Sequence, residues 1–409
     1  MAGSSSPITF GVELEFNVFK RAEDLQGYAE AISYFGKALA KETNLPIAGK
    51  CRCIGGQTCH GCASVPETYR QIARQMTVYG HPVRNHTQDK VYRGNAPYEY
   101  YFVMNENCAP AGRSDLVGME ISTPVRKADQ IASGLPEIGS LIKALSELPC
   151  HIQIGKGTGL HIHVGSEAKL TLRLAQKVIT LVAILEQPFL QAFQPQSRRD
   201  SSAQYAGPIL SGARIVKNMA ALGQIWQMAA MYKRERAQVD AHIPPTGRQN
   251  NTYWQKNGKE IETLLHGVWT APKLSQLSQG IARNGIERLG FAIALRGDEP
   301  YENKESSFEF RYGDMTFDNA YIAMWVSVVS RIVELGHLDT AAFSSNVSGI
   351  LQALSTWSQT RPEACFADIL RALDFSPVQV QAWLPLIEEH RAGRDRFVDQ
   401  SRRLIPQSS

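Results

Sequence analysis

Three short segments, far apart in the chain, alternate between apolar and polar residues. Such alternation is typical of a β-strand that is buried on one face, because successive side chains point to opposite faces of a strand. The apolar positions of each segment would pack on a core, so its polar positions would face a cleft or solvent. The segments are residues 10–16 (FGVELEF), 159–165 (GLHIHVG) and 307–313 (SFEFRYG).

The polar faces of these predicted strands consist of ionisable side chains. They are Glu13 and Glu15 in the first segment, His161 and His163 in the second, and Glu309 and Arg311 in the third. Carboxylates and imidazoles are ligands for divalent metal ions, and a guanidinium binds phosphate. If the strands are neighbours, these side chains predict a site for a metal ion and a phosphate group.

Other stretches predict helices and further strands. Apolar residues recur at helical spacing in residues 25–41, 128–148, 171–193, 220–237 and 318–336, and three more helices are predicted within residues 340–402. Strands are predicted at residues 98–106 and 116–123, and a hairpin at residues 151–165. No repeated strand–helix unit is visible. We therefore expect an α+β fold in which an antiparallel sheet carries the site on one face and helices cover the other.

Composition narrows the class of protein. The chain has 409 residues, of which 43% are hydrophobic and 20% charged, as in an ordinary globular enzyme. Its net charge of +4 gives no case for a nucleic-acid partner. No apolar run approaches the roughly 20 residues that span a membrane, and the first residues lack the features of a secretory signal. A cytoplasmic protein without membrane or nucleic-acid partners is therefore expected.

Four of the seven cysteines fall within residues 50–64 (KCRCIGGQTCHGCAS). They are Cys51, Cys53, Cys59 and Cys62. Closely spaced thiolates can converge on a tetrahedral ion, which makes this segment a candidate structural zinc site. The alternative is a loop with reduced thiols. The odd total argues against a disulfide framework, and the other three cysteines are expected to be buried.

A fourth segment, residues 118–125 (GMEISTPV), adds Glu120. The order GVELE, MEISTP, GLHIHVG and FEFRYGDMT resembles the amidoligase family, which comprises carboxylate–amine ligases related in fold to glutamine synthetase and glutamate–cysteine ligase. The resemblance is specific in these four motifs and weak elsewhere. It implies a glutamine synthetase-like catalytic core in residues 1–336, with loop-rich insertions near residues 48–96 and 194–257. Residues 337–409 would form a helical region packed on that core.

The resemblance also implies a reaction. Such ligases use ATP to convert a carboxylate into an acyl phosphate, which an amine then attacks, so small carboxylates and amines are the expected partners. Magnesium or manganese would neutralise the phosphates. The implied metal ligands are Glu13, Glu15, Glu120, His163 and Glu309, with Glu15 and Glu120 on one ion and the others on a second. The implied catalytic residues are Glu309, Arg311, which would grip the transferred phosphoryl group, and His161, which would bind either metal or phosphate.

Several alternatives stay open at this point. The turn at residues 155–159 (GKGTG) could cradle ATP phosphates through Lys156, Gly157 and Thr158, or it could be a plain hairpin turn. Residues 312–316 depart from the ligase pattern, which leaves the substrates unassigned. A metal-dependent amidohydrolase could use the same glutamates and histidines to activate water. Related ligases often form oligomers, and the sequence does not decide whether this chain forms a homo-oligomer.

Overall fold

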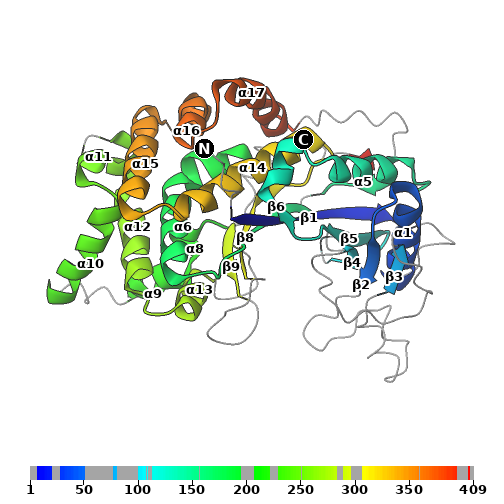
Figure 1. The fold of residues 1–409 in the computed structure, drawn as a ribbon, viewed down its shortest axis with the longest axis horizontal. Helices are drawn as coiled ribbons and strands as arrows, with labels where there is room; N and C mark the ends of the chain where they lie inside the picture. Colours follow the sequence, from blue (N-terminus) through cyan, green and yellow to red (C-terminus); the bar gives the residue numbers. More distant parts are fainter. Residues whose placement is uncertain are drawn as a thin grey trace. The chain divides into compact units, whose positions relative to one another are not determined.

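The computed structural model shows helices, strands and short connections (Figure 1). The described residues are 7–20, 28–50, 77–80, 100–106, 108, 113–155, 157–194, 207–221, 229–249, 251–282, 289–295, 306–358, 360–393 and 404–405. The chain forms two compact units, each assembled from separate stretches of sequence. The first unit comprises Met1–Thr9, His163–Gly313 and Met324–Arg394, and the second comprises Phe10–Ile162, Asp314–Ala323 and Asp395–Ser409.

Most strands of the second unit pair side by side, in the order β3-β2-β4-β5-β1-β8. Their bounds are β1 (Ile8–Phe19), β2 (Ile47–Lys50), β3 (Thr77–Gly80), β4 (Tyr101–Asn105), β5 (Leu116–Ser122) and β8 (Gly159–Ser166). Three short strands lie off this order: β6 (Arg126–Lys127) and β7 (Ile152–Gln153) pair with β1, and β11 (Leu404–Ile405) pairs with β7. The two strands predicted at residues 98–106 and 116–123 are confirmed as the antiparallel pair β4 and β5.

The prediction of an antiparallel sheet was wrong in part, because the sheet is mixed. β2 runs parallel to β4, and β11 runs parallel to β7. After β2, the next strand β3 turns back along one edge of β2. β4 then lies along the other edge and points the same way as β2. The sequence around β2 and β3 has little alternation, so this crossover left no pattern to detect.

Helices cover one face of the second unit's strands. α1 (Tyr28–Thr43) contacts β2, β3 and β4, as seen at the blue end of the chain in Figure 1. The Phe35 ring of α1 meets Phe16 of β1 edge-on at 5.9 Å. Because Phe16 belongs to the apolar face of β1, the helices cover that face, and the glutamates of β1 point the other way. This division into a helix-covered face and a polar face agrees with the expectation from the sequence.

The predicted helix at residues 128–148 is two helices. A short 3-10 helix, η1 (Ala128–Ser133), precedes α5 (Pro136–Glu147). Gly134 and Leu135 between them have φ angles of 76° and 54°, in the left-handed region that interrupts a right-handed helix. Pro136 then starts α5, where its missing N–H costs nothing.

The hairpin predicted at residues 151–165 was also wrong. β7 pairs with β1 through Gln153 opposite Asn17 and Ile152 opposite Val18, and β8 likewise neighbours β1. The intervening residues make a tight turn, closed by the Thr158 N–H donating to the Gly155 carbonyl at 3.0 Å. The glycines that suggested a hairpin serve instead to let the chain pass close to its neighbours.

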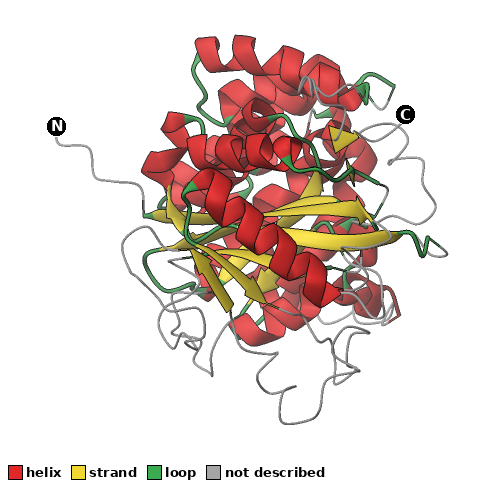
Figure 2. Ribbon diagram, turned by 90° about the vertical axis from the view of Figure 1, so that its right-hand side faces the viewer, coloured by secondary structure: helices red, strands yellow, loops and turns green. Residues whose placement is uncertain are grey.

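The first unit is mainly helical. Figure 2 distinguishes the helices (red) of the structure from its strands (yellow). Its α-helices include α6 (Leu172–Leu185), α8 (Ile209–Gly212), α9 (Arg214–Ala221), α10 (Ala229–His242), α11 (Pro245–Gln249), α12 (Thr252–Thr270), α13 (Leu274–Ile281), most of α14 (Asn319–Gly336), α15 (Thr340–Ala353), α16 (Phe366–Ala372) and α17 (Pro377–Arg391). Its strands β10 (Ser307–Asp314) and β9 (Phe291–Ala294) form an antiparallel pair. The helices after residue 336 belong to this unit.

The core of the first unit surrounds α6, which is buried throughout from Leu174 to Leu185. The Phe193 ring contacts Trp325 at 5.4 Å and Phe366 at 5.2 Å, so three separate helical segments meet at one aromatic cluster. The predicted helices at residues 171–193 and 318–336 are confirmed, with Asp318 capping the start of α14 as expected. Within the described part of the chain, no helix has both the length and the apolar character needed to cross a membrane.

Candidate metal centre

The register between β1 and β5 brings two of the predicted metal ligands directly opposite each other. Glu15 pairs with Glu120, and Glu13 pairs with Ser122. Directly opposed residues in an antiparallel pair point to the same face, so Glu13, Glu15 and Glu120 share the face away from the helices. The Ser122 hydroxyl donates a hydrogen bond of 2.5 Å to the Glu120 carboxylate and so fixes its orientation.

A third carboxylate joins this pair from β4. Met104 lies opposite Glu120, and the Glu106 N–H donates to the Gly118 carbonyl at 3.0 Å, which extends the β4–β5 register by one step. Glu106 therefore shares the face of Met104 and Glu120. Glu106 was not among the ligands predicted from the sequence, although the signal was present. It is the last residue of a predicted strand, and it lies two residues after Met104, which is opposite Glu120.

The carboxylates of Glu15, Glu106 and Glu120 form a compact and buried group. Each offers an oxygen within 4.8 Å of the others, and the three residues are 0%, 3% and 0% exposed. Three negative charges at this separation and burial repel one another strongly. Two oxygens on one magnesium ion are at most about 4.2 Å apart, so a small side-chain adjustment would bring all three onto one ion. The donor set therefore fits a hard divalent cation.

His161 is the histidine that contacts the carboxylates of the second unit. Its Nδ1 lies 3.3 Å from Glu13 Oε2 and 3.6 Å from Glu15 Oε1, and the residue is 1% exposed. From the sequence, His163 is the expected metal ligand, and His161 is expected to bind either metal or phosphate. Its contact with two glutamates makes His161 the better placed of the two for the metal ions that Glu13 and Glu15 would hold.

Cys108 lies beside the acidic group without contributing a thiolate. Its Sγ donates to the carbonyl of Phe16 at 3.4 Å and to the Asn17 side-chain oxygen at 3.5 Å. Burial, reinforced by the nearby charges of Glu15 and Glu106, raises the pKa of the Cys108 thiol well above its usual value. The thiol therefore stays protonated, and oxygen ligands alone define the neighbouring site. Cys108, Cys150 and Cys365 are all buried free cysteines, as expected.

The remaining predicted site residues, His163, Glu309 and Arg311, belong to the first unit. Arg311 donates from Nε and Nη2 to the two carboxylate oxygens of Glu309, at 2.8 Å for Nη2, which confirms that the two side chains share a face of β10. His163 contacts the same strand, with Nδ1 at 3.1 Å from Ser307 Oγ and Nε2 at 3.9 Å from Glu309 Oε1. This group combines a carboxylate, a possible metal ligand, with a guanidinium, a possible phosphate ligand.

The turn proposed to hold phosphates has a structural explanation for two of its residues. The buried Thr158 hydroxyl donates to the Gly155 carbonyl at 2.8 Å, so it closes the turn. A side chain at Gly157 would place its Cβ 2.4 Å from the Cys108 carbonyl oxygen, which only glycine avoids. Lys156 lies outside the described residues, as do Cys51, Cys53, Cys59 and Cys62, so the phosphate and zinc predictions for them stay predictions.

Comparisons with known proteins add no assignment. The chain matches no protein-family model and no curated protein. The class of site therefore rests on the chemistry of the side chains: a buried group of three carboxylates with a histidine and a fourth glutamate beside it. Oxygen ligands of this kind suit magnesium or manganese, whereas a typical zinc site uses mainly nitrogen and sulfur.

Proposed function

We propose that this protein is an ATP-dependent carboxylate–amine ligase that joins small molecules or amino acids by an amide bond through an acyl-phosphate intermediate. The observation that carries the proposal is the buried group of Glu15, Glu106 and Glu120 on one face of the second unit's strands. The four motifs that resemble amidoligases supply three of the strands that build or flank this face. ATP use would place the enzyme in the cytoplasm.

The acidic group suits phosphoryl transfer better than hydrolysis. A carboxylate becomes a good acyl donor only after phosphorylation, and that transfer requires cations that neutralise the polyphosphate. Magnesium or manganese held by Glu15, Glu106 and Glu120 would supply this charge. A hydrolytic centre that activates water for amide cleavage more often uses zinc held by histidines. The excess of carboxylates over histidines therefore favours the ligase.

The ligase resemblance assigns Arg311 to the transferred phosphoryl group. The guanidinium keeps its positive charge at any physiological pH and presents a planar fork of donors. In the structure this fork is occupied by Glu309, which holds the side chain extended and oriented. Exchange of one carboxylate oxygen for a phosphoryl oxygen would need little movement of Arg311. This residue thus acts as the proposed electrostatic clamp.

The test is an assay for ADP release with ATP, magnesium and a pool of carboxylates and amines. The proposal expects ADP only when a carboxylate and an amine are both present, and loss of that signal in Glu120→Gln. Arg311→Lys keeps the charge but not the fork, and its turnover should fall roughly a hundredfold with ATP binding little changed. Amide hydrolysis without nucleotide would refute the proposal, as would wild-type turnover in both variants.

A further inference from the structure

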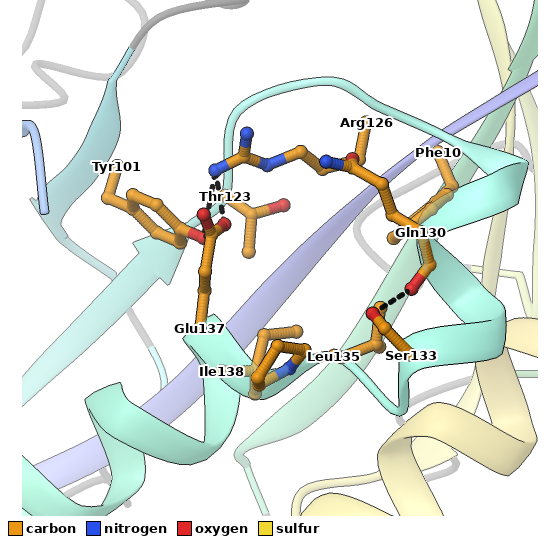
Figure 3. A pocket seen from close by; sticks show the side chains of 10 residues that line it. Phe10, Tyr101, Thr123, Arg126, Gln130, Ser133, Leu135, Glu137 and Ile138 are labelled. Carbon is orange, nitrogen blue, oxygen red and sulfur yellow. Dashed lines mark hydrogen bonds and ion pairs between the residues drawn. The ribbon is translucent and has the colours of Figure 1, made fainter.

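A separate cavity lies against the helix-covered face of the same strands, wholly within the second unit (Figure 3). Its volume is about 100 Å³. The wall includes Phe10 of β1, Tyr101 of β4, Thr123 after β5, Arg126, Gln130 and Glu137. Phe10 and Thr123 have the opposite parity to Glu15 and Glu120 on their strands, so the cavity and the acidic group lie on opposite faces. The cavity is therefore not part of the proposed metal centre.

One charged pair and a tyrosine line one side of the cavity. Arg126 Nη2 donates to Glu137 Oε2, and the Tyr101 hydroxyl donates to the same oxygen at 2.5 Å. Arg126 Nη2 also lies 3.2 Å from the Tyr101 hydroxyl, and the guanidinium sits over the tyrosine ring at 5.5 Å from its centroid. Burial, together with the hydrogen bond to Glu137, raises the pKa of Tyr101, so the phenol stays neutral and continues to donate.

The pair leaves hydrogen-bonding capacity on both charged partners. Both contacts fall on Glu137 Oε2, which leaves Oε1 outside this network. Arg126 Nε is buried and has no hydrogen-bond partner among the described residues. A buried donor without a partner costs free energy, which a ligand oxygen would recover. Both residues line the cavity, so its wall includes a carboxylate and a guanidinium with an unpartnered donor.

The rest of the wall restricts what could fill this space. Phe10, Leu135 and Ile138 are buried apolar residues that form part of the wall, and they leave room only for a short side chain. A simple anion would be attracted by Arg126 but repelled by Glu137. A simple cation would be attracted by Glu137 but repelled by Arg126. A zwitterion complements both charges at once. The small volume excludes a nucleotide.

We propose that this cavity binds a small α-amino acid as a zwitterion. Its carboxylate would accept from Arg126, its ammonium would donate to Glu137, and a short side chain would face Phe10 and Ile138. The site is independent of the proposed ligase chemistry, because it needs neither ATP nor the acidic group on the other face of the strands.

Titration calorimetry on the full chain, without nucleotide or added metal, tests the proposal. L-Alanine and glycine should bind, while acetate, methylamine and inorganic phosphate should bind at least tenfold more weakly. Arg126→Met and Glu137→Gln should each weaken alanine binding at least tenfold. The matched controls are Arg113→Met and Asp115→Asn, because Arg113 and Asp115 form an exposed bidentate ion pair elsewhere in the same unit. These controls should bind alanine as the wild type does.

Two further variants test whether alanine binds in this cavity and not elsewhere. Gln130→Trp fills the cavity from an exposed position and leaves the ion pair intact, so it should abolish binding even if Arg126→Met proves unstable by circular dichroism. Glu120→Gln should bind alanine normally, which separates this cavity from an amino-acid substrate site at the metal centre. Equal affinity for acetate and alanine, absence of binding, or full binding in Gln130→Trp would each overturn the proposal.

Discussion

At the scale of single residues, Glu106 adds a third carboxylate to the face that carries Glu15 and Glu120. Two buried carboxylates, such as Glu15 and Glu120, can share one proton and remain stable together. A third carboxylate within 4.8 Å adds negative charge that proton sharing between two of them does not remove. A divalent cation would offset this charge. If the proposed metal centre is correct, Glu106 therefore contributes to it as well as the opposed pair.

This reasoning predicts the effect of Glu106→Gln, which keeps the shape of the side chain and removes one charge. Affinity for manganese or magnesium, measured by titration calorimetry, should fall at least tenfold, since ligand charge sets the strength of such sites. Amide-forming turnover at limiting magnesium should fall with it. Glu147→Gln, an exposed change on α5 in the same unit, should alter neither quantity. Unchanged metal affinity in Glu106→Gln would remove this residue from the centre.

At the scale of secondary-structure elements, the end of α6 depends on one buried carboxyl group. The helix widens into a π-helical turn, η2 (Glu186–Leu190), around Pro188, which has no N–H for the regular ladder. Glu186 at its start accepts the N–H groups of Ile209 at 2.7 Å and Leu210 at 3.0 Å. The Tyr312 hydroxyl of β10 also donates to it at 2.6 Å. This carboxyl therefore ties α6, α8 and β10 together.

The same carboxyl predicts a pH dependence of stability. Burial raises the pKa of Glu186 from 4.5 to about 7, despite the hydrogen bonds from Tyr312 and the two backbone N–H groups, which lower it. Because the folded pKa lies above the unfolded one, its contribution to stability is complete below pH 4.5 and is lost as the pH rises through 7. The shift corresponds to about 3 kcal/mol.

Urea unfolding at several pH values checks this prediction. Relative to the wild type, Glu186→Gln should gain stability as the pH rises from 5 to 7 and then level off towards pH 8, because it cannot ionise, whatever its constant cost in hydrogen bonding. The exposed change Glu388→Gln on α17 provides the control and should run parallel to the wild type. A constant difference between Glu186→Gln and the wild type across this range would show that the buried carboxyl does not titrate there.

The elements also show where sequence patterns succeed. Alternation predicted the faces of β1 and β10 correctly, because one side of each is packed against apolar residues and the pleat fixes the other. It could not distinguish a hairpin from two strands that both border β1, since both arrangements use glycines in the connection. The break at Gly134 and Leu135 was missed because apolar spacing continues across it.

At the scale of the whole molecule, the organisation depends on contacts between distant parts of the sequence. Each compact unit is assembled from three separate stretches of sequence, and β1 and β8 contribute residues to both units. The predicted division into residues 1–336 and 337–409 follows the linear order of the sequence, which does not report such exchanges. Glu106 shows the same within the site. It lies beside Glu120 only because β4 pairs with β5, and the sequence of β4 by itself does not reveal that pairing.

The final prediction concerns the unfolding temperature of the whole molecule. The direction in which Glu120→Gln and magnesium change this temperature distinguishes a metal centre from an ordinary polar cluster. Without metal, Glu15, Glu106 and Glu120 repel one another, so Glu120→Gln should unfold at the same temperature as the wild type or at a higher one. A cation that binds only the folded chain at a hundred times its dissociation constant adds about 2.7 kcal/mol. Magnesium should therefore raise the unfolding temperature of the wild type by several degrees.

Both effects are measured by thermal unfolding without magnesium and at magnesium concentrations that increase in tenfold steps. Glu120→Gln should lose most of the magnesium-dependent gain while keeping its metal-free stability. Sodium chloride at equal ionic strength controls for screening of surface charges, because it screens them without supplying a divalent ion to the carboxylates. If Glu120→Gln is strongly destabilised without metal and magnesium leaves the wild type unchanged, the three carboxylates have a structural role and the proposed metal centre is wrong.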